Sequence, residues 1–358
     1  MTNRVFVIAE AGVNHDGSSD DARRMIDVAA DAGADAVKFQ TFHADQLVTR
    51  RAAKAAYQAR NTGRDDGQHA MLKALELDRD THRMLAAHAA ARGVRFMSTA
   101  FDLDSLDFLV GLDMPAVKIP SGDLTWGAML LRAARVGRPL IVSTGMASLD
   151  EIGEALKVIA FGMARQGTPA GAADLEDAMA DPAAQANLRD RVTLLHCTTE
   201  YPAPLRAVNL RAMDVMRERF GLPVGYSDHT LGTTVAIAAV ARGATVIEKH
   251  FTLDRGRTGP DHAASLEPDQ LATMIAAIRE VESALGAARK EPALEEIANR
   301  EIARRSLVAA RPIAVGEIFS LDNLTAKRPA DGLSPMAIWP LLGRSSSRDY
   351  AADEAIES

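Results

Sequence analysis

A recurring order of helix, glycine and apolar run constrains the fold of this chain more than any other feature. Residues 27–33 form a helical pattern that ends in glycine and leads into the apolar run 36–42. Residues 85–93 lead into residues 94–99 in the same way. Each glycine stands where a helix often ends in a left-handed residue. Strands that alternate with helices are typical of right-handed crossovers and a parallel sheet.

Eight apolar runs end in polar or ionisable residues and are the candidate strands. They are residues 5–12, 36–42, 94–99, 116–122, 140–145, 192–198, 224–230 and 246–252. Eight strand–helix units fit an α/β fold of the (β/α)8 TIM barrel type, which typically needs about 250 residues. A doubly wound open sheet is the alternative, but the first strand is not followed by the Gly-x-Gly-x-x-Gly fingerprint of dinucleotide-binding folds.

The pattern changes near residue 286, which predicts two domains. We expect a barrel domain over residues 1–286, a charged linker over 287–304 and a small β-rich domain over 305–358. About 50 residues are marginal for an independent core, so the small domain is expected to rest on something larger, such as a second subunit.

Two long connections interrupt the regular barrel pattern. Residues 43–77 are expected to form a partly helical flap over the barrel mouth. Residues 161–191 are rich in Ala, Asp and Pro, carry no recognisable chemistry and are expected to be a surface excursion.

Charge and composition exclude several classes of function. The net charge is -7 and the chain has no Lys/Arg block, so a role in binding nucleic acid or a membrane surface has no electrostatic support. The chain enters a strand at once without a signal-peptide pattern, and no apolar run approaches about 20 residues, so we expect a cytoplasmic protein. The one cysteine excludes an intramolecular disulfide and a multi-cysteine zinc site.

The last two candidate strands each end in a histidine. The seventh carries Ser227 and His229, and the eighth carries Glu248 and His250. Side-chain alternation places the two residues of each pair on one face, and the strands should be parallel neighbours. A single histidine would more simply hydrogen-bond in a packed strand end. Two neutral imidazoles on consecutive strands instead favour a divalent metal site.

Lysines interrupt two of the buried strand patterns at the end where a TIM barrel builds its active site. A buried lysine such as Lys38 or Lys118 needs an anionic partner. Ser and Thr hydroxyls crowd the same strand ends, so we expect a pocket for a phosphate or carboxylate. The alternative is that the lysines are neutralised by Glu10, Asp123 or Glu248.

Polar motifs stand at nearly every strand end. They include Ile-Ala-Glu-Ala-Gly-Val-Asn-His-Asp-Gly at 8–17, Val-Lys-Phe-Gln-Thr-Phe at 37–42, Lys-Ile-Pro-Ser-Gly-Asp at 118–123, Ser-Thr-Gly-Met at 143–146, His-Cys-Thr-Thr-Glu-Tyr-Pro at 196–202, Gly-Tyr-Ser-Asp-His-Thr at 225–230, Glu-Lys-His-Phe at 248–251 and Gly-Pro-Asp-His at 259–262. Together they resemble the sialic acid synthase family, which includes the legionaminic and pseudaminic acid synthases. The resemblance runs from Phe6 to about Ile356, and the C-terminal piece resembles that family's antifreeze-like SAF domain.

The resemblance implies a condensation of phosphoenolpyruvate with an open-chain N-acyl mannosamine-type aldehyde. The products are a nine-carbon 2-keto-3-deoxy acid and phosphate, which leaves by C–O cleavage after water adds at C2. It also implies a divalent ion, Mn2+ or Mg2+, held by His229 and His250. The ion polarises the aldehyde while C3 of phosphoenolpyruvate attacks it.

The resemblance assigns roles to individual positions of this chain. The expected catalytic residues are Glu10, Lys38, His229 and His250. The expected substrate-binding residues are Gln40, Thr99, Lys118, Ser121, Asp123, Ser143, Tyr201, Ser227, Glu248, Asp261 and Arg328. The last of these lies in Lys-Arg-Pro at 327–329 and is expected to reach across a domain-swapped homodimer to the N-acyl group of the sugar.

Two positions depart from the family pattern and bear on the sugar. Asp123 stands where the family often has glutamate, and Thr199 stands where some members have asparagine or serine. The preferred interpretation is an N-acetylneuraminate synthase, with legionaminic or pseudaminic acid synthesis as the nearest alternatives. From other classes, a metal-dependent aldolase that uses free pyruvate and a non-catalytic sugar-binding protein stay open.

Overall fold

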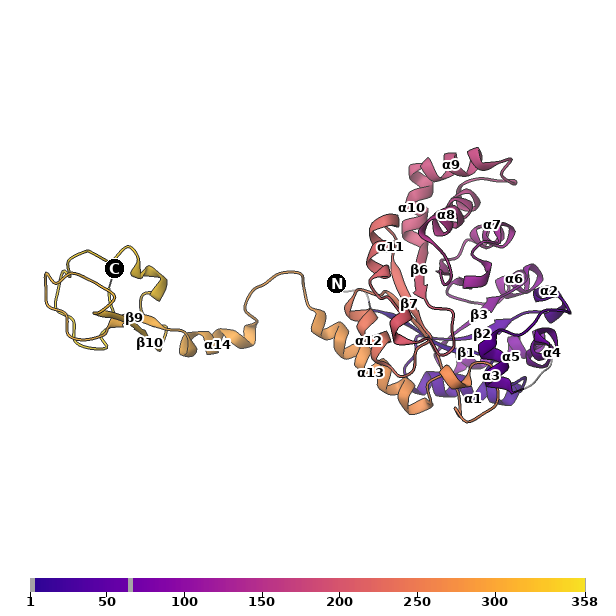
Figure 1. Ribbon diagram of the computed structural model, residues 1–358, viewed down its shortest axis with the longest axis horizontal. Coiled ribbons are helices and arrows are strands. Elements are labelled where there is room, and N and C mark those ends of the chain that lie inside the picture. The colour runs from indigo at the N-terminus through magenta and orange to yellow at the C-terminus, as the bar shows by residue number, and fades with distance from the viewer. Residues whose placement is uncertain (1–3, 64–66, 358) are drawn as a thin grey trace. The chain divides into compact units, whose positions relative to one another are not determined.

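Eight parallel strands close into a barrel in which each strand pairs with the next and β8 pairs with β1 (Figure 1). This computed structural model describes residues 4–63 and 67–357. The strands are β1 (Phe6–Gly12), β2 (Ala36–Thr41), β3 (Arg95–Ala100), β4 (Val117–Ile119), β5 (Leu140–Ser143), β6 (Val192–Cys197), β7 (Val224–Asp228) and β8 (Val246–His250). The predicted TIM barrel is confirmed. β4 is shorter than predicted because Pro120 offers no backbone N–H for the ladder and a 3-10 turn, Ser121–Asp123, follows it.

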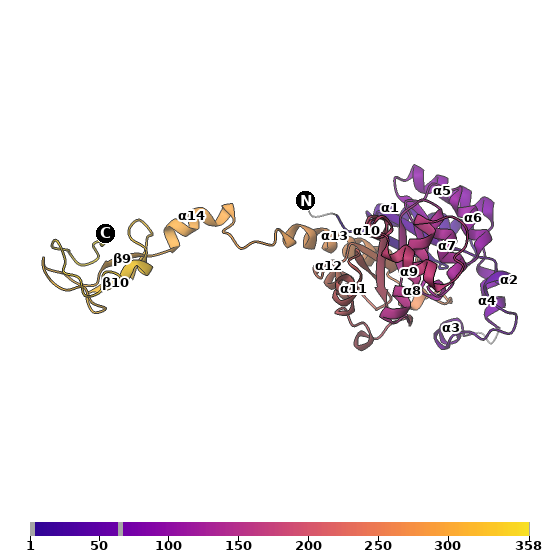
Figure 2. The same cartoon turned by 90° about the horizontal axis from the view of Figure 1, so that it is seen from above.

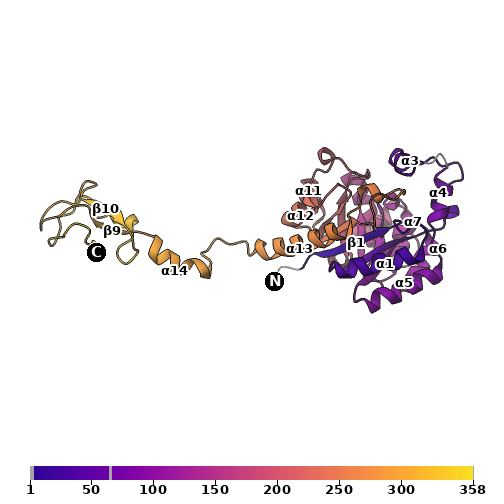
Figure 3. The same ribbon diagram turned by 90° about the horizontal axis from the view of Figure 1, so that it is seen from below.

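A ring of helices surrounds the barrel. These are α1 (Ser19–Asp31), α5 (Arg79–Ala91), α6 (Leu103–Val110), α7 (Gly127–Arg135), α8 (Leu149–Ala164), α11 (Ala212–Phe220), α12 (Thr234–Ala241) and α13 (Pro268–Leu285). Figure 3 shows α1 and α5 side by side along one flank. The glycines predicted at helix ends, such as Gly33 at φ +79° and Gly243 at φ +85°, adopt the left-handed conformation that lets the chain turn back into a strand.

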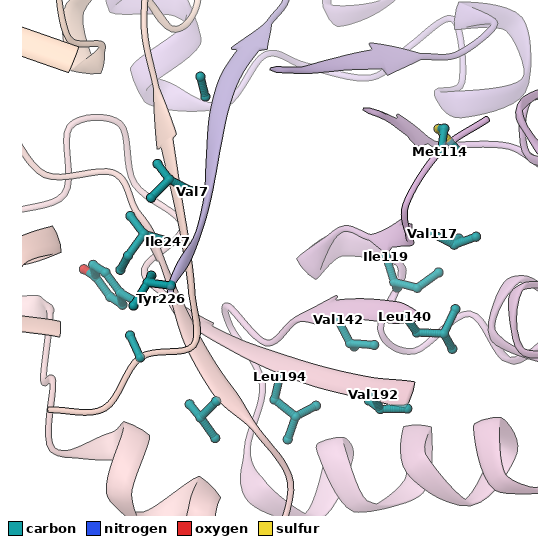
Figure 4. Close-up of a cluster of buried hydrophobic side chains, with 14 of the residues drawn as sticks. Val7, Met114, Val117, Ile119, Leu140, Val142, Val192, Leu194, Tyr226 and Ile247 are labelled. Carbon is teal, nitrogen blue, oxygen red and sulfur yellow. The ribbon is translucent and has the colours of Figure 1, made fainter. Parts of the chain in front are cut away.

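Strand side chains alternate between two apolar layers. One face packs outward against the helices and includes Val7, Val142, Leu194 and Ile247 (Figure 4). The other face fills the barrel interior with Ile8, Ala36, Met97, Ala116, Ile141, Leu195 and Val246. Because the alternation continues along each strand, the next inward residues lie at the carboxyl end of the barrel.

The two long connections are both helical in part. Between β2 and β3 lie α2 (Ala44–Leu47), α3 (Ala56–Thr62) and α4 (Gln68–Leu75), while residues 64–66 of the predicted flap lie outside the described residues. Between β5 and β6, α9 (Ala172–Ala180) and α10 (Pro182–Arg191) pack against α8 (Figure 2). The expected surface excursion is therefore a pair of helices, with Asp181 capping the second.

A second compact unit begins at Ala287, directly after the barrel unit ends at Gly286. It contains α14 (Leu294–Ala303) and the antiparallel pair β9 (Ser306–Ala309) and β10 (Leu324–Lys327). Its small core is formed by Leu307, Ala309, Ile313, Phe319, Leu324, Leu341, Tyr350 and Ile356. Across the described parts of both units, no helix has the length and apolarity needed to cross a membrane.

Candidate active site

Polar side chains occupy the inward face at the carboxyl ends of the strands, one layer beyond the apolar interior. The buried members of this layer are Glu10, Lys38, Thr99, Lys118, Ser143, Ser227, Glu248, His229 and His250. They come from seven consecutive neighbours of the closed barrel, β7 through β8 and β1 to β5, and from the turn after β7, so segments far apart in sequence meet here.

Lys38 contacts both carboxylates of this layer, one from β1 and one from β8. Its Nζ lies 2.5 Å from Glu10 Oε2 and 3.4 Å from Glu248 Oε2, and it donates a hydrogen bond to Thr99 Oγ1 at 2.8 Å. Burial disfavours the ammonium, but the two carboxylates outweigh it, so the net effect raises the pKa of Lys38. The lysine is therefore a fixed positive charge inside the barrel mouth.

Lys118 forms the second cationic position. Its Nζ donates to Ser143 Oγ at 2.6 Å and to the Ile119 carbonyl at 3.0 Å, and it lies 3.9 Å from Glu248 Oε1. Burial lowers the pKa of Lys118, although Glu248 acts in the opposite direction. Of the three carboxylates suggested as neutralising partners, two pair with the lysines, and Asp123 is in neither ion pair.

The two paired carboxyl groups differ in their proton affinity. Burial raises the pKa of Glu10 to about 7, although Lys38 acts against this effect. For Glu248, burial is outweighed by Lys118 and Lys38, which hold its pKa at about 2. Near neutral pH the two lysines therefore face a fully ionised Glu248 and a partly protonated Glu10. The net positive charge that is left can bind an anionic ligand.

His229 and His250 lie side by side, with ring centroids 5.5 Å apart. His229 Nδ1 is 2.7 Å from the Thr198 carbonyl, which requires the proton on Nδ1 and leaves a lone pair on Nε2. Ser227 Oγ is 3.3 Å from that Nε2, but it donates to Glu248 Oε1 at 2.8 Å. No hydrogen-bond donor among the described residues therefore occupies the lone pair on Nε2 of His229.

The histidine pair suits a divalent metal by its chemistry. Burial lowers the pKa of His229 and of His250, so both imidazoles are neutral. His250 Nδ1 is buried and has no hydrogen-bond partner among the described residues, and Asp261 Oδ2 is 3.9 Å away. Over residues 4–63 and 67–357, no group of three or more His, Cys, Asp or Glu converges, so the two imidazoles are the candidate ligands.

An aromatic and acidic wall stands beside the histidines. The Tyr201 ring lies 4.1 Å from that of His229 and 5.5 Å from that of His250, measured between centroids. Burial raises the pKa of Asp261, the acidic member of this wall, to about 6.

Asp123 is a second buried carboxyl group, in the 3-10 turn that follows β4, and burial raises its pKa to about 6 as well. Asp123 Oδ2 is buried without a hydrogen-bond partner among the described residues, as expected for a group that awaits a polar ligand.

The β4–η1 and β5–α8 turns meet closely at Gly145. Its N–H donates to Ser121 Oγ at 3.0 Å, and Ser121 Oγ is 3.2 Å from Cys197 Sγ. A Cβ on Gly145 would overlap Thr199 Oγ1, so only glycine fits. Burial raises the pKa of the Cys197 thiol, which makes it a packing group rather than a nucleophile.

Some polar strand-end residues lie elsewhere. The His196 side chain is on the outward face and its Nε2 is 2.7 Å from the Val208 carbonyl. Gln40 shares the inward face with Lys38 and is half-buried, and Arg328 is exposed in the second unit. Sequence reasoning missed Tyr57 of α3, whose ring centroid is 5.0 Å from that of Tyr201. Its only sequence signal is an aromatic residue in an alanine-rich stretch of the flap.

Comparisons with known proteins agree with this architecture. The model of the NeuB family matches residues 25–290, and the model of the SAF domain matches residues 304–357. The chain is 45% identical over 353 residues to N,N'-diacetyllegionaminic acid synthase of Campylobacter jejuni, covering 99% of both chains. It is 42% identical to the enzyme of the same name in Legionella pneumophila, covering 97% of this chain and 92% of that one.

A solved structure extends the comparison to three dimensions. The N-acetylneuraminic acid synthetase of Leptospira borgpetersenii, in complex with citrate, is 30% identical and superposes with a TM-score of 0.68, covering 83% of this chain and 90% of that one. The resemblance found in the strand-end motifs is thus confirmed over nearly the whole chain. The chain belongs to the NeuB family and is an enzyme of the nonulosonic acid synthase type with a C-terminal SAF domain.

Proposed function

We propose that this enzyme is an N,N'-diacetyllegionaminic acid synthase, which condenses phosphoenolpyruvate with a 2,4-diacetamido-6-deoxymannose-type sugar. One observation carries the choice of sugar. Identity is 45% and 42% to two enzymes of that name, against 30% to the sialic acid synthetase of known structure. The alternative raised by the sequence is therefore better supported than its preferred interpretation, N-acetylneuraminate synthase, which is the second candidate.

Phosphoenolpyruvate is proposed to bind deep in the mouth between the two lysines. Lys38 and Lys118 supply the positive charge, and Thr99 and Ser143, which already contact their ammonium groups, supply hydroxyls. An anion that enters would take over part of the role of Glu10 and Glu248 as the lysines' partners. The pairing of lysines and carboxylates thus keeps the buried cations compensated while the pocket is empty of substrate.

Glu10 is proposed to handle the proton of the attacking water. In the overall reaction, C3 of phosphoenolpyruvate bonds to the aldehyde carbon, water adds at C2, and phosphate leaves with the bridging oxygen. The water must lose a proton and the aldehyde oxygen must gain one. A carboxyl with a pKa of about 7 can do either near neutral pH, and Glu10 lies beside Lys38 in the buried layer.

His229 and His250 are proposed to hold Mn2+ or Mg2+ through their free ring nitrogens. A metal bound there supplies Lewis acidity toward the aldehyde oxygen of the sugar. The protein's own groups fix the rest of the geometry. The Thr198 carbonyl sets the tautomer of His229, Tyr201 packs on its ring, and Asp261 offers a polar group next to His250.

Initial rates of phosphate release test the proposal. The enzyme is assayed with phosphoenolpyruvate and Mn2+, using either 2,4-diacetamido-6-deoxymannose or N-acetylmannosamine at matched concentrations. We expect kcat/KM to be higher for the diacetamido sugar. A preference for N-acetylmannosamine would make the enzyme an N-acetylneuraminate synthase, and turnover of free pyruvate without phosphate release would make it an aldolase.

A further inference from the structure

Helix α3 is fastened to two loops that follow barrel strands. Arg60 Nη2 lies 3.0 Å from Oε1 of Glu200, which follows β6. Asn61 Nδ2 donates a hydrogen bond at 2.7 Å to the carbonyl of Pro260, which follows β8. Because these strands carry the site's aromatic and acidic wall, the two contacts hold α3 at the edge of the barrel mouth.

Tyr57 is the residue of α3 that faces this wall. Its ring centroid is 5.0 Å from that of Tyr201, which in turn lies 4.1 Å from that of His229. Burial raises the pKa of Tyr57, with Asp261 adding to the effect, so the phenol is neutral and close to that carboxyl group. Three rings thus form a continuous aromatic row from the histidine pair to the helix.

We infer that Tyr57 is a specificity-determining residue that packs its ring against the far, C6 end of the sugar; this inference rests on the proposed function. The aldehyde carbon, C1, must meet phosphoenolpyruvate deep in the mouth, beside the histidines. The open chain of the sugar then extends outward. There the row of rings ends at Tyr57, on the helix α3 that is tied to the loops after β6 and β8. The face of a phenol ring is apolar, so it favours a C6 methyl group over a hydroxymethyl group, whose hydroxyl would lose water there.

The neighbouring groups differ in which part of the sugar they can bind. Asp261, whose Oδ2 lies 3.9 Å from His250 Nδ1, offers a carboxyl group to hydroxyl and acylamino N–H groups along the chain. The Tyr57 ring offers no equivalent acceptor on its face. Tyr57 of α3 therefore recognises the missing oxygen at C6. The residues that follow the strands recognise the polar substituents.

Steady-state kinetics of Tyr57→Ala and Tyr57→Phe test the inference in the full-length enzyme. We expect Tyr57→Ala to raise KM for 2,4-diacetamido-6-deoxymannose by roughly 10-fold or more, the size expected for one methyl-scale apolar contact. KM for phosphoenolpyruvate should stay within about twofold, as the lysine pocket is untouched. Tyr57→Phe keeps the ring and should retain the wild-type KM. Arg50→Ala, on an exposed arginine of the same connection, is the matched control and should match the wild type.

The outcomes separate this inference from the proposed function. Wild-type preference between the two sugars tests the proposed function, on which the inference rests, and the ratio of KM for variant and wild type tests Tyr57. If the wild type prefers the diacetamido sugar and Tyr57→Ala leaves its KM unchanged, only the role of Tyr57 is overturned. An equal rise in KM for phosphoenolpyruvate, or an equal defect in Tyr57→Phe, would also overturn it. A wild type that prefers N-acetylmannosamine overturns both.

Discussion

Replacement of Lys38 by methionine tests how the buried charges of the mouth depend on one another. The substitution keeps most of the side-chain length and removes the ammonium group. It leaves Glu10 and Glu248, whose side chains are 2% and 6% exposed, without the cation that lies 2.5 and 3.4 Å from them. Removing one partner of a buried ion pair typically costs about 3–5 kcal/mol of folding free energy.

Protonation of Glu10 sets the pH dependence of this loss. Its pKa is already about 7 with Lys38 present, and removing the ammonium raises it further. The penalty is therefore fully present above the new pKa and shrinks as the pH falls, because Glu10 then carries a proton. We expect Lys38→Met to lower the unfolding free energy by about 3 kcal/mol at pH 8, and by clearly less at pH 6. Glu10→Gln/Lys38→Met should be more stable than Lys38→Met at pH 8.

The kinetic effect of the same change should fall on phosphoenolpyruvate. Loss of one charge-assisted contact, about 1.5–3 kcal/mol, corresponds to roughly 10- to 100-fold in kcat/KM for phosphoenolpyruvate. Lys249→Met is the matched control, because Lys249 pairs with Asp228 at 2.9 Å and is equally buried but on the outward face of the strand. It should lose stability while keeping KM for phosphoenolpyruvate.

Thermal and urea unfolding at pH 6 and pH 8, with initial rates over a range of phosphoenolpyruvate concentrations, give both readouts. A Lys38→Met variant that keeps kcat/KM for phosphoenolpyruvate within about twofold of the wild type would contradict a role of Lys38 in binding this substrate. An equal loss of stability at both pH values would contradict the role of Glu10 protonation.

Three further predictions address the metal, the buried carboxyl group of Asp123 and the small domain. His229→Ala or His250→Ala should abolish Mn2+-dependent turnover and weaken Mn2+ binding measured by calorimetry without substrates; undiminished binding would contradict the metal assignment. Burial raises the pKa of Asp123 to about 6 from 3.8, so its ionisation opposes folding fully above pH 6 and not at all below about pH 3.8. Asp123→Asn should therefore raise the unfolding free energy by about 1 kcal/mol at pH 7.5, a value reduced for the partial exposure of Asp123, and by little at pH 4. An equal gain at both pH values would contradict ionisation of Asp123 as the cause. Arg328→Ala should raise KM for the sugar without changing the oligomeric state measured by light scattering, and normal sugar kinetics would exclude its predicted reach into a partner subunit.

Much of the barrel follows from local pattern in the sequence. Glycine after several of the helices and the apolar runs that follow predict the strands, and side-chain alternation predicts their inward faces, because left-handed turns and alternation are local properties. The same alternation predicts that Ser227 and His229 share a face, and in the structure Ser227 Oγ lies 3.3 Å from His229 Nε2. The end of β4 was placed too late, since the strand pattern continues through Pro120 although the ladder does not.

Contacts between distant segments could not be read from the sequence. The pattern indicates that Lys38 needs an anion and offers Glu10, Asp123 or Glu248, but only the closed barrel selects Glu10 and Glu248 and places Lys38 between them. The helices of residues 161–191 lack a strong apolar period and depend on packing against α8. Tyr57 was missed for the same reason, since its stacking partner lies far along the chain and only the tertiary fold joins them.

The most direct test of the account is a competition experiment analysed by mass spectrometry. The enzyme receives phosphoenolpyruvate, Mn2+ and equal concentrations of 2,4-diacetamido-6-deoxymannose and N-acetylmannosamine, and the two nine-carbon keto acids are quantified at low conversion. Their ratio equals the ratio of kcat/KM for the two sugars. The account predicts that the diacetamido keto acid dominates. An excess of N-acetylneuraminate would contradict it and restore the sialic acid synthase interpretation.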